Sequence, residues 1–173
     1  QDGIARVAKI IQDLKDFARS DNSTSWVKAD LHACLDSALN IAANEIKYKA
    51  DVHREYGALP EIECLPAQMG QVFLNILVNA AQAMPGDHGR GTITVRSGCA
   101  DDDHVRIEIS DTGCGMDAAQ IKRIFEPFYT TKPVGLGTGL GLSISYGIIQ
   151  RHSGHTEATS AIGQGTTFRI VLP

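Results

Sequence analysis

Three segments of the chain alternate apolar and polar residues at every second position, and they occupy residues 92–96, 105–109 and 167–172. A period of two is typical of a β-strand that buries one face and exposes the other. Because a short polar stretch separates the first two segments, we expect them to pair as a hairpin. We expect the third segment to close the sheet.

Other segments carry apolar residues at helical spacing. Asp30 is placed to cap a helix whose apolar residues run from Leu31 to Ile46. The pattern predicts a long helix over 69–84, with Pro66 suited to a first turn, and a further helix over 140–151.

Two shorter extended pieces complete the pattern, one over 52–56 and one near Ile62. Helices and strands mix along the chain without a regular βαβ repeat. The predicted fold class is therefore α+β, a two-layer sandwich in which one mixed sheet is covered on one face by helices.

A separate amphipathic helix is expected before this domain, within residues 1–20, followed by a polar linker over 21–27 and the folded domain over 28–173. Its apolar residues take alternating steps of three and four, as in a heptad seam. They are Ile4, Val7, Ile11, Leu14 and Ala18. We expect the seam to pack in a helical bundle or dimer; a helix covering the domain's own core is the alternative.

The amino-acid composition excludes several classes of protein for this chain. The 173 residues are 43% hydrophobic and 21% charged, which is ordinary for a globular domain, and the net charge of −4 argues against nucleic acid as the main partner. No apolar run is long enough for a membrane span, so no membrane contact is expected. The four cysteines form no CxxC pair, which favours reduced thiols in the cytoplasm. Since the chain begins at Gln1, we interpret it as a piece of a longer protein.

A glycine-rich run, residues 135–141, places four glycines at alternate positions directly before a predicted helix. Glycine lets the backbone approach a ligand closely, and a helix N-terminus attracts anions, phosphate above all. Such a loop is a weak signal alone, since many are only flexible. It lacks the Gly-Lys-Ser/Thr of a Walker A loop.

A second candidate is the turn 111–116, directly after a predicted strand. The carboxylate of Asp111 could accept a hydrogen bond from an exocyclic amine such as that of adenine. The alternative is an ordinary turn in which Asp111 bonds neighbouring amides.

Asn75 and Asn79 lie four residues apart on the long predicted helix, so their side chains share one face. Paired carboxamide oxygens can serve Mg²⁺, which takes its other ligands from water and phosphate. Structural asparagines bonded to backbone are the alternative. Residues 125–132 are expected to form a mobile lid hinged on aromatic rings, with Lys132 available to neutralise phosphate.

In order and spacing, these pieces resemble the ATP-binding catalytic domain of bacterial sensor histidine kinases. Residues 75–79 are similar to the N box of that family, 111–115 to its G1 box, 125–128 to its F box and 135–141 to its G2 box. The run 163–168 is similar to its final glycine box.

The resemblance implies the Bergerat fold, with ATP and Mg²⁺ as ligands. Asp111 would bond the adenine amine, Asn79 would be the main metal ligand, and Asn75 would help to position the metal or the phosphates. Thr166 or Thr167 would lie near the edge of the base. The ATP-binding residues implied are Asn75, Asn79, Asp111, Gly113, Gly115, Met116, Lys132, Gly137, Thr138, Gly139, Leu140, Gly141, Thr166 and Thr167.

The implied reaction is transfer of the γ-phosphoryl group of ATP to a histidine on a dimerisation helix, for relay to an aspartate of a response regulator. The implied partners are the protein's own dimerisation and phosphoacceptor domain, in a homodimer of the full protein, and a receiver domain. Residues 1–20 resemble the C-terminal part of that dimerisation and phosphoacceptor hairpin. No histidine of this chain is followed by the acidic residue of the phosphoacceptor motif, so the acceptor is expected upstream of Gln1.

Two other functions remain open at this point. The chain could be a degenerate nucleotide-binding signalling module, or an ATPase or serine kinase of the same superfamily. Related ATPases carry a glutamate where Asn75 stands. Because a neutral amide cannot act as a general base, Asn75 favours the kinase.

Overall fold

The computed structural model describes residues 25–86, 89–133 and 137–173. The helix expected within residues 1–20 lies outside the described residues. In chain order the elements are β1 (Val27–Ala29), α2 (Leu31–Ile46), β2 (Ala50–Tyr56), β3 (Ile62–Cys64), α3 (Pro66–Ala83), β4 (Gly91–Cys99), β5 (Val105–Asp111), α4 (Ala118–Ile121), α5 (Gly141–Arg151), β6 (His155–Ala161) and β7 (Gly165–Leu172).

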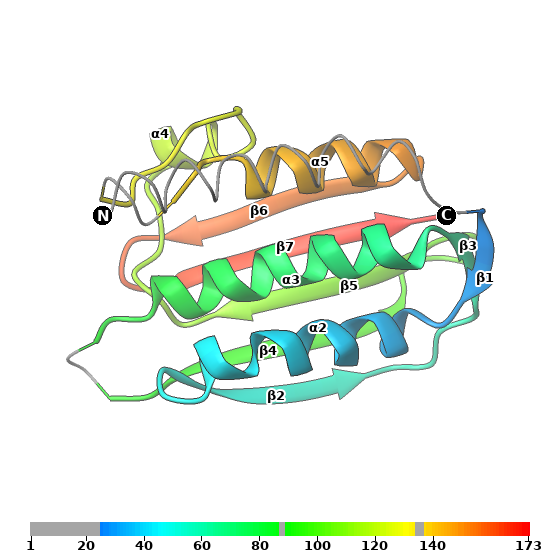
Figure 1. Ribbon diagram of the computed structural model, residues 1–173, viewed down its shortest axis with the longest axis horizontal. Coiled ribbons are helices and arrows are strands. Elements are labelled where there is room, and N and C mark those ends of the chain that lie inside the picture. Colours follow the sequence, from blue (N-terminus) through cyan, green and yellow to red (C-terminus); the bar gives the residue numbers. More distant parts are fainter. Residues whose placement is uncertain (1–24, 87–88, 134–136) are drawn as a thin grey trace, which may run out of the picture.

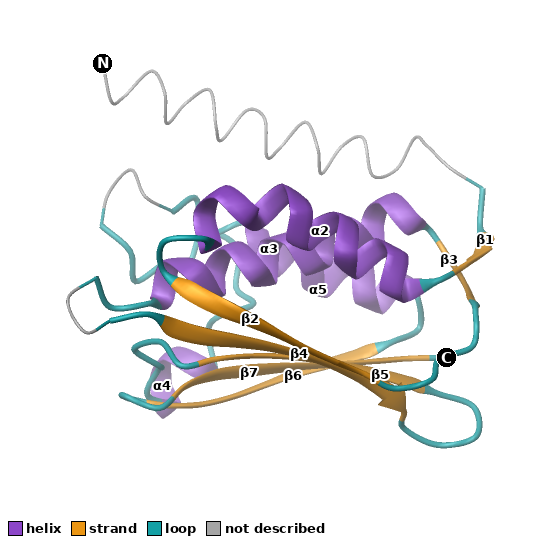
Figure 2. Ribbon diagram, turned by 90° about the horizontal axis from the view of Figure 1, so that it is seen from below, coloured by secondary structure: helices purple, strands orange, loops and turns teal. Residues whose placement is uncertain are grey.

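The molecule has two layers, a five-stranded sheet and three helices that cover one of its faces (Figures 1 and 2). The strand order is β2-β4-β5-β7-β6; β2 and β4 run parallel, and every other neighbouring pair in this sheet runs antiparallel. The predicted α+β sandwich with a mixed sheet is confirmed, and so is the hairpin of β4 and β5.

One prediction about the sheet is wrong. The last strand, β7, does not close the sheet but lies inside it, between β5 and β6. The edge strand on this side is β6, which pairs antiparallel with β7 across a tight turn, and β2 forms the other edge. Its residues are mostly small and polar, and only Thr156 is buried, so β6 lacks the alternating apolar pattern of the inner strands. Edge strands with one bonded neighbour need less apolar burial than inner ones.

The core lies between the two layers. Helix α2 begins after Asp30, whose carboxylate accepts the backbone N–H of His32 at 2.8 Å, as an N-cap should. The buried stripe of α2 then recurs at helical spacing. Helix α3 buries Phe73 and Leu77 at the centre of the same layer. Within the described residues, no helix is long and apolar enough to cross a bilayer.

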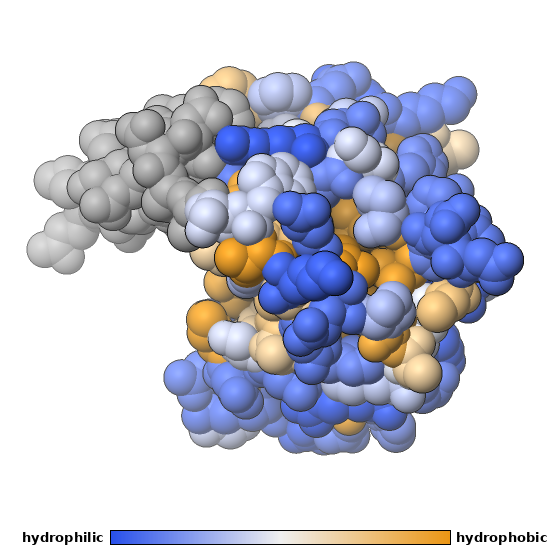
Figure 3. All heavy atoms as spheres, turned by 90° about the vertical axis from the view of Figure 1, so that its right-hand side faces the viewer, coloured by the Kyte–Doolittle hydropathy of each residue, from blue (hydrophilic) through white to orange (hydrophobic). Residues whose placement is uncertain are grey.

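Strands β1 and β3 form a small two-stranded sheet that attaches the start of the described chain to the end of the helical layer. Val27 pairs with Cys64, and the Trp26 ring packs on the ring of His152 with centroids 4.7 Å apart, so these two residues of the expected linker contact the folded domain. Figure 3 faces this end of the molecule and shows patches of hydrophobic surface among hydrophilic residues.

His152, at the end of α5, bonds Leu65, the N-cap residue of α3, which makes no side-chain capping bond of its own. The Leu65 N–H donates to His152 Nε2 at 3.1 Å, and the other ring nitrogen, Nδ1, donates to the carbonyl of Ile148 at 2.8 Å. Because Nε2 accepts, the proton of the neutral ring lies on Nδ1. Burial lowers the pKa of His152 below its usual value. The buried ring of His152 therefore has a structural role.

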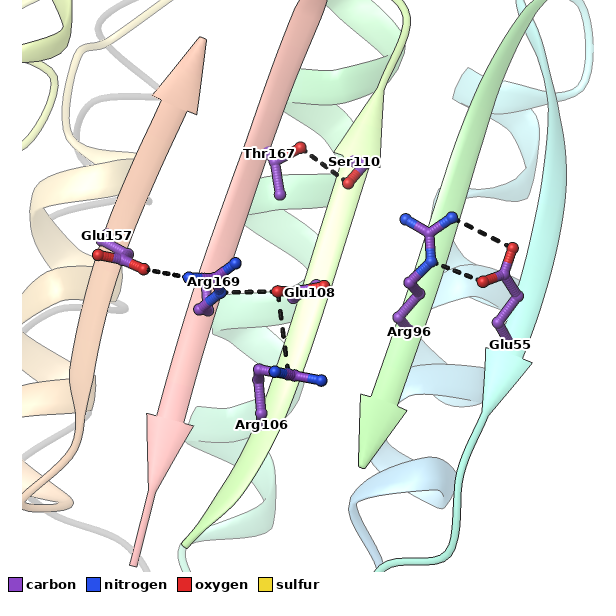
Figure 4. A network of polar contacts seen from close by, with 8 residues as sticks. All are labelled: Glu55, Arg96, Arg106, Glu108, Ser110, Glu157, Thr167 and Arg169. Atoms are coloured by element: carbon purple, nitrogen blue, oxygen red, sulfur yellow. Dashed lines mark hydrogen bonds and ion pairs between the residues drawn. The ribbon is translucent and has the colours of Figure 1, made fainter. Parts of the chain in front are cut away.

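The opposite face of the sheet is open and polar (Figure 4). Arg169 donates to Glu108 at 2.6 Å and to Glu157 at 2.7 Å, and so joins three neighbouring strands. Arg96 pairs with Glu55 at 2.6 Å across β4 and β2. These cross-strand pairs account for the polar half of the alternating pattern, since their side chains point away from the helices.

Candidate functional site

A cavity of about 1290 Å³ runs along α2 and α3, from Asp30 and Pro66 to Ala83. The turn after β5, the lid segment and the start of α5 also line it. Eleven of the predicted site residues line it. They are Asn75, Asn79, Asp111, Gly115, Met116, Lys132, Gly137, Thr138, Gly139, Gly141 and Thr166.

Three predicted site residues do not line the cavity. Thr167 points to the open face of the sheet, where its hydroxyl bonds that of Ser110 at 2.8 Å (Figure 4). Leu140 is buried in the core. Gly113 lies behind the Asp111 carboxylate and donates its N–H to Oδ1 at 2.8 Å. Of the two threonines offered by the sequence, the structure therefore brings Thr166 to the cavity.

Asp111 is the most buried ionisable group of the cavity, with 8% of its surface exposed. It is the last residue of β5, which fixes its backbone within the sheet. Burial raises the pKa of its carboxyl, although hydrogen bonds from the Gly113 and Thr166 backbone act in the opposite direction. A carboxylate has about four lone-pair sites, so the two backbone hydrogen bonds leave acceptor capacity for an amine donor.

The turn that follows Asp111 is held from both sides. The Cys114 N–H donates to the carbonyl of Ala83 at the end of α3, at 2.9 Å, and the Met116 N–H donates to Ser160 Oγ at 2.8 Å. Gly115 has a positive φ of 68°, and a Cβ there would lie 1.9 Å from the carbonyl oxygen of Ala161. Only glycine fits, so the turn packs directly against the β6–β7 hairpin.

Asn75 is bonded to the start of α5. Its Nδ2 donates to the carbonyl of Gly141 at 3.0 Å and to Ser145 Oγ at 3.1 Å. These contacts join α3 to the helix that follows the glycine-rich loop, across 66 and 70 residues of the chain. No described residue donates a hydrogen bond to Asn75 Oδ1.

Asn79, one turn further along α3, contacts the lid segment instead. Lys132 Nζ donates to Asn79 Oδ1 at 2.8 Å and also to Gln82 Oε1. The ammonium group therefore lies against the carboxamide oxygen that the sequence predicts as a metal ligand. Both asparagines offer oxygen donors of the kind that Mg²⁺ prefers, and the described residues hold no cluster of three or more His, Cys, Asp or Glu side chains that could bind a metal.

The lid segment and the glycine-rich run are in close contact, with the backbone of Phe128 against that of Gly139. The Phe128 N–H donates to the carbonyl of Gly139 at 2.9 Å, and a Cβ on Gly139, whose φ is 70°, would lie 2.4 Å from the Phe128 carbonyl carbon. The Phe125 ring packs on the Tyr146 ring of α5, with centroids 5.2 Å apart. These contacts agree with the predicted hinge of packed rings.

Helix α5 starts inside this cavity. Leu140 precedes it as the N-cap residue and makes no side-chain capping bond. Gly141 lines the cavity and is the first helical residue. An N-terminus without a side-chain cap leaves backbone N–H groups for an anion, and the helix dipole adds to that attraction.

Sequence reasoning missed three residues that support the site: Ser145, Ser160 and Gln82. Ser160 Oγ bonds the Thr166 hydroxyl at 2.9 Å and thereby ties the threonine of the cavity to the Asp111 turn. Ser145 lies four residues after Gly141, a spacing at which a helical serine commonly bonds back to the carbonyl. That spacing was the only signal available, because the other contacts join segments far apart in the sequence.

The comparisons with known proteins agree with this geometry. Residues 64–173 match the family described as histidine kinase-, DNA gyrase B-, and HSP90-like ATPase. Sporulation kinase E of Bacillus subtilis (strain 168) is 49% identical over 115 residues, which is 66% of this chain and 15% of that protein. The signal transduction histidine-protein kinase AtoS of Escherichia coli (strain K12) is 37% identical over 172 residues, 98% of this chain and 27% of that protein. The chain thus spans only a small part of these relatives.

Solved structures give the same result. The mycobacterial sensor histidine kinase MprB superposes with a TM-score of 0.74 at 27% identity, over 86% of this chain and 97% of that one. The catalytic domain of histidine kinase ThkA gives a TM-score of 0.74 at 26% identity, over 87% and 96% of the two chains. The chain therefore belongs to the histidine kinase-, DNA gyrase B- and HSP90-like ATPase family, as the ATP-binding catalytic domain of a two-component sensor histidine kinase.

Proposed function

We propose that this domain binds ATP with Mg²⁺ and transfers the γ-phosphoryl group to a histidine on the dimerisation helix of its own parent protein. The phosphoryl group would then pass to an aspartate on the receiver domain of a response regulator. The reaction would take place on the cytoplasmic side. The observation that carries the proposal is the convergence of Asp111, Asn75 and Asn79, and the uncapped start of α5 on one cavity.

Each part of the cavity suits a different part of the nucleotide. Asp111 is the carboxylate for the adenine amine, and Thr166 lies beside it as a second polar group for the base. The α5 N-terminus and the glycine-rich run supply backbone N–H groups for phosphate. Asn79, helped by Asn75, would hold Mg²⁺, which when bound neutralises phosphate charge during transfer.

Lys132 is the residue that must change partners. Its ammonium group now bonds two neutral amide oxygens, those of Asn79 and Gln82. A phosphate is a stronger, charge-assisted acceptor for an ammonium group than an amide is. Nucleotide binding is therefore expected to draw Lys132 to the phosphates and to release Asn79 Oδ1 for the metal.

The test begins with a calorimetric titration of the chain with Mg²⁺ and a non-hydrolysable ATP analogue. We expect micromolar-range binding by the native chain and none by Asn79→Ala. The melting temperature of the ligand-free variant should shift by less than about 2 °C, because Asn79 is not part of the core. Asn40→Ala, an exposed asparagine on α2, is the matched control and should bind as the native chain does.

The second step supplies the missing acceptor. The parent protein's dimerisation hairpin is added with γ-labelled ATP, and we expect acid-labile label on the hairpin and none on this chain alone. Nucleotide binding without any transfer to that hairpin would contradict the kinase and support a nucleotide-gated signalling module. Steady phosphate release that persists in Asn79→Ala would point to an ATPase.

A further inference from the structure

The carboxamide of Asn75 can adopt only one orientation in this structure. The carbonyl oxygen of Gly141, 3.0 Å away, can accept a hydrogen bond but cannot donate one. The nitrogen of the amide must therefore face Gly141, and the oxygen must face the other way. This assignment follows from the chemistry of the partner, so it does not depend on telling nitrogen from oxygen by position.

Ser145 takes the second N–H of the same amide. Its hydroxyl donates to the Gly141 carbonyl at 2.9 Å, which leaves the lone pairs of Oγ to accept from Asn75 Nδ2 at 3.1 Å. The serine is 3% exposed and lies on the first turns of α5, so water does not compete for either bond. Both hydrogens of Nδ2 are thus used, and Oδ1 is the polar atom of Asn75 that remains for the cavity it lines.

A lone carboxamide oxygen discriminates between the two charged parts of a metal–nucleotide complex. It attracts a cation, or the hydrogen of a cation-bound water, and it repels the oxygens of phosphate. Turned by 180°, the same amide would present N–H groups that bond phosphate directly and need no metal. The orientation of Asn75 therefore decides whether this position favours the metal or the phosphates.

We propose that Ser145 is a positioning residue that, together with the Gly141 carbonyl, fixes the Asn75 carboxamide with only its oxygen toward the cavity, so that the site prefers nucleotide carrying Mg²⁺ over metal-free nucleotide. This inference rests on the proposed function. It assigns a role to a buried hydroxyl on α5 that does not itself touch the nucleotide.

The experiment compares two titrations of one preparation of the 173-residue chain, with the ATP analogue in excess Mg²⁺ and with the analogue in a chelator. Ser145→Ala should weaken binding of the Mg²⁺ complex by about two- to tenfold, the effect of one hydrogen bond, and should change metal-free binding by less than about twofold. Partial unfolding would reduce the binding stoichiometry in both titrations alike, so the ratio of the two affinities reports the role of Ser145 alone.

Ser143→Ala is the matched control. Ser143 lies on the same helix, and its hydroxyl donates to the Leu140 carbonyl at 2.9 Å without contacting Asn75. This variant should keep the native ratio of metal-bound to metal-free affinity. An equal change of the ratio in both serine variants would overturn the inference.

A double-mutant cycle tests whether Ser145 acts through Asn75. In the Asn75→Ala background, Ser145→Ala should have no further effect on the affinity ratio, because the group that it positions is gone. Additive effects would refute the role, and so would an equal loss of affinity with and without metal. If the native chain bound no nucleotide at all, the proposed function would fail; if it bound but its ratio were insensitive to Ser145, this inference alone would fail.

Discussion

At the scale of single residues, burial of the Asp111 carboxylate lowers the stability of the fold at neutral pH, and the same carboxylate is proposed to bind the adenine amine. Its carboxylate is buried at the end of β5, where burial raises its pKa, and it is stabilised by the N–H of Gly113. A carboxyl group with a raised pKa favours the folded state most when protonated. Its contribution to stability is fully present below its unfolded pKa, near 3.8, and is lost as the pH rises through the folded value.

Asp111→Asn should therefore raise the melting temperature of the ligand-free domain at pH 7 and weaken binding of the ATP analogue by about 10- to 100-fold. Asparagine keeps the oxygen that accepts from Gly113, but it removes both the buried charge and the second acceptor. The stability difference should vanish below about pH 3.8, which thermal unfolding between pH 3 and 7 can follow.

Asp102→Asn provides the control for this prediction, because Asp102 is an exposed residue of the β4–β5 turn region and is remote from the cavity lining. It should change neither the pH dependence nor the binding. A ligand-free Asp111→Asn domain that melted below the native domain at pH 7 would show that the carboxylate stabilises the turn more than its burial costs.

At the scale of elements, His152 joins the end of α5 to the start of α3. The ring packs on Trp26 of the segment that leads into β1 and accepts the Leu65 N–H, and its pKa, lowered by burial, is lowered further by the charge of Arg151. Helix α3 carries Asn75 and Asn79, and the N-terminus of α5 lies at the same cavity. This contact at the far ends of the two helices therefore helps to fix their mutual orientation.

His152→Leu should destabilise the domain by about 1–3 kcal/mol, because it leaves the buried Leu65 N–H without its acceptor. The pH dependence should change too. Since burial lowers the folded pKa of His152, protons bind the unfolded chain first, and native stability falls as the pH drops below about 6.5 toward the folded value.

The variant should lack that part of the fall in stability between pH 7 and 5, as measured by denaturant unfolding. His53→Leu, at an exposed position of β2, is the control and should retain it. Equal pH slopes for native chain and His152→Leu would exclude His152 as the titrating group.

At the scale of the whole molecule, the two faces of the sheet serve different purposes. The helix-covered face holds the core and the cavity, and the open face carries the cross-strand pairs of Figure 4. On the open face, the side chain of Glu108 is only 14% exposed and lies 2.6 Å from Arg169 and 3.9 Å from Arg106. Glu55 is about half exposed and, among the described residues, pairs with one arginine, Arg96.

Glu108→Gln should therefore lower the melting temperature by a few degrees, and the loss should shrink at high salt. Glu55→Gln should have little effect, since exposed pairs contribute little. Neither substitution should alter nucleotide affinity, because both side chains lie across the sheet from the cavity. Calorimetry of both variants at low and high salt checks the ranking, and equal losses would contradict it.

The sequence by itself determined the chemical groups of this domain and most of its elements, although β1, α4 and β6 were not predicted. The period of two located β4, β5 and β7, the helical spacing located α2, α3 and α5, and the motifs named eleven residues that line the cavity. These elements could be predicted because buried apolar residues recur at a fixed spacing within a single strand or helix. The same signals did not predict β6, because its small polar residues show no such spacing.

Only the tertiary structure decided how distant segments pair. It placed β6 rather than β7 at the edge of the sheet, directed Thr166 rather than Thr167 to the cavity, and set Lys132 against Asn79. It also brought Ser145 to Asn75, 70 residues away in the chain. A periodic pattern shows which side of a segment is buried. The partner of a polar atom depends instead on the topology of the fold, so hydrogen bonds between segments far apart in the chain cannot be predicted from the local sequence.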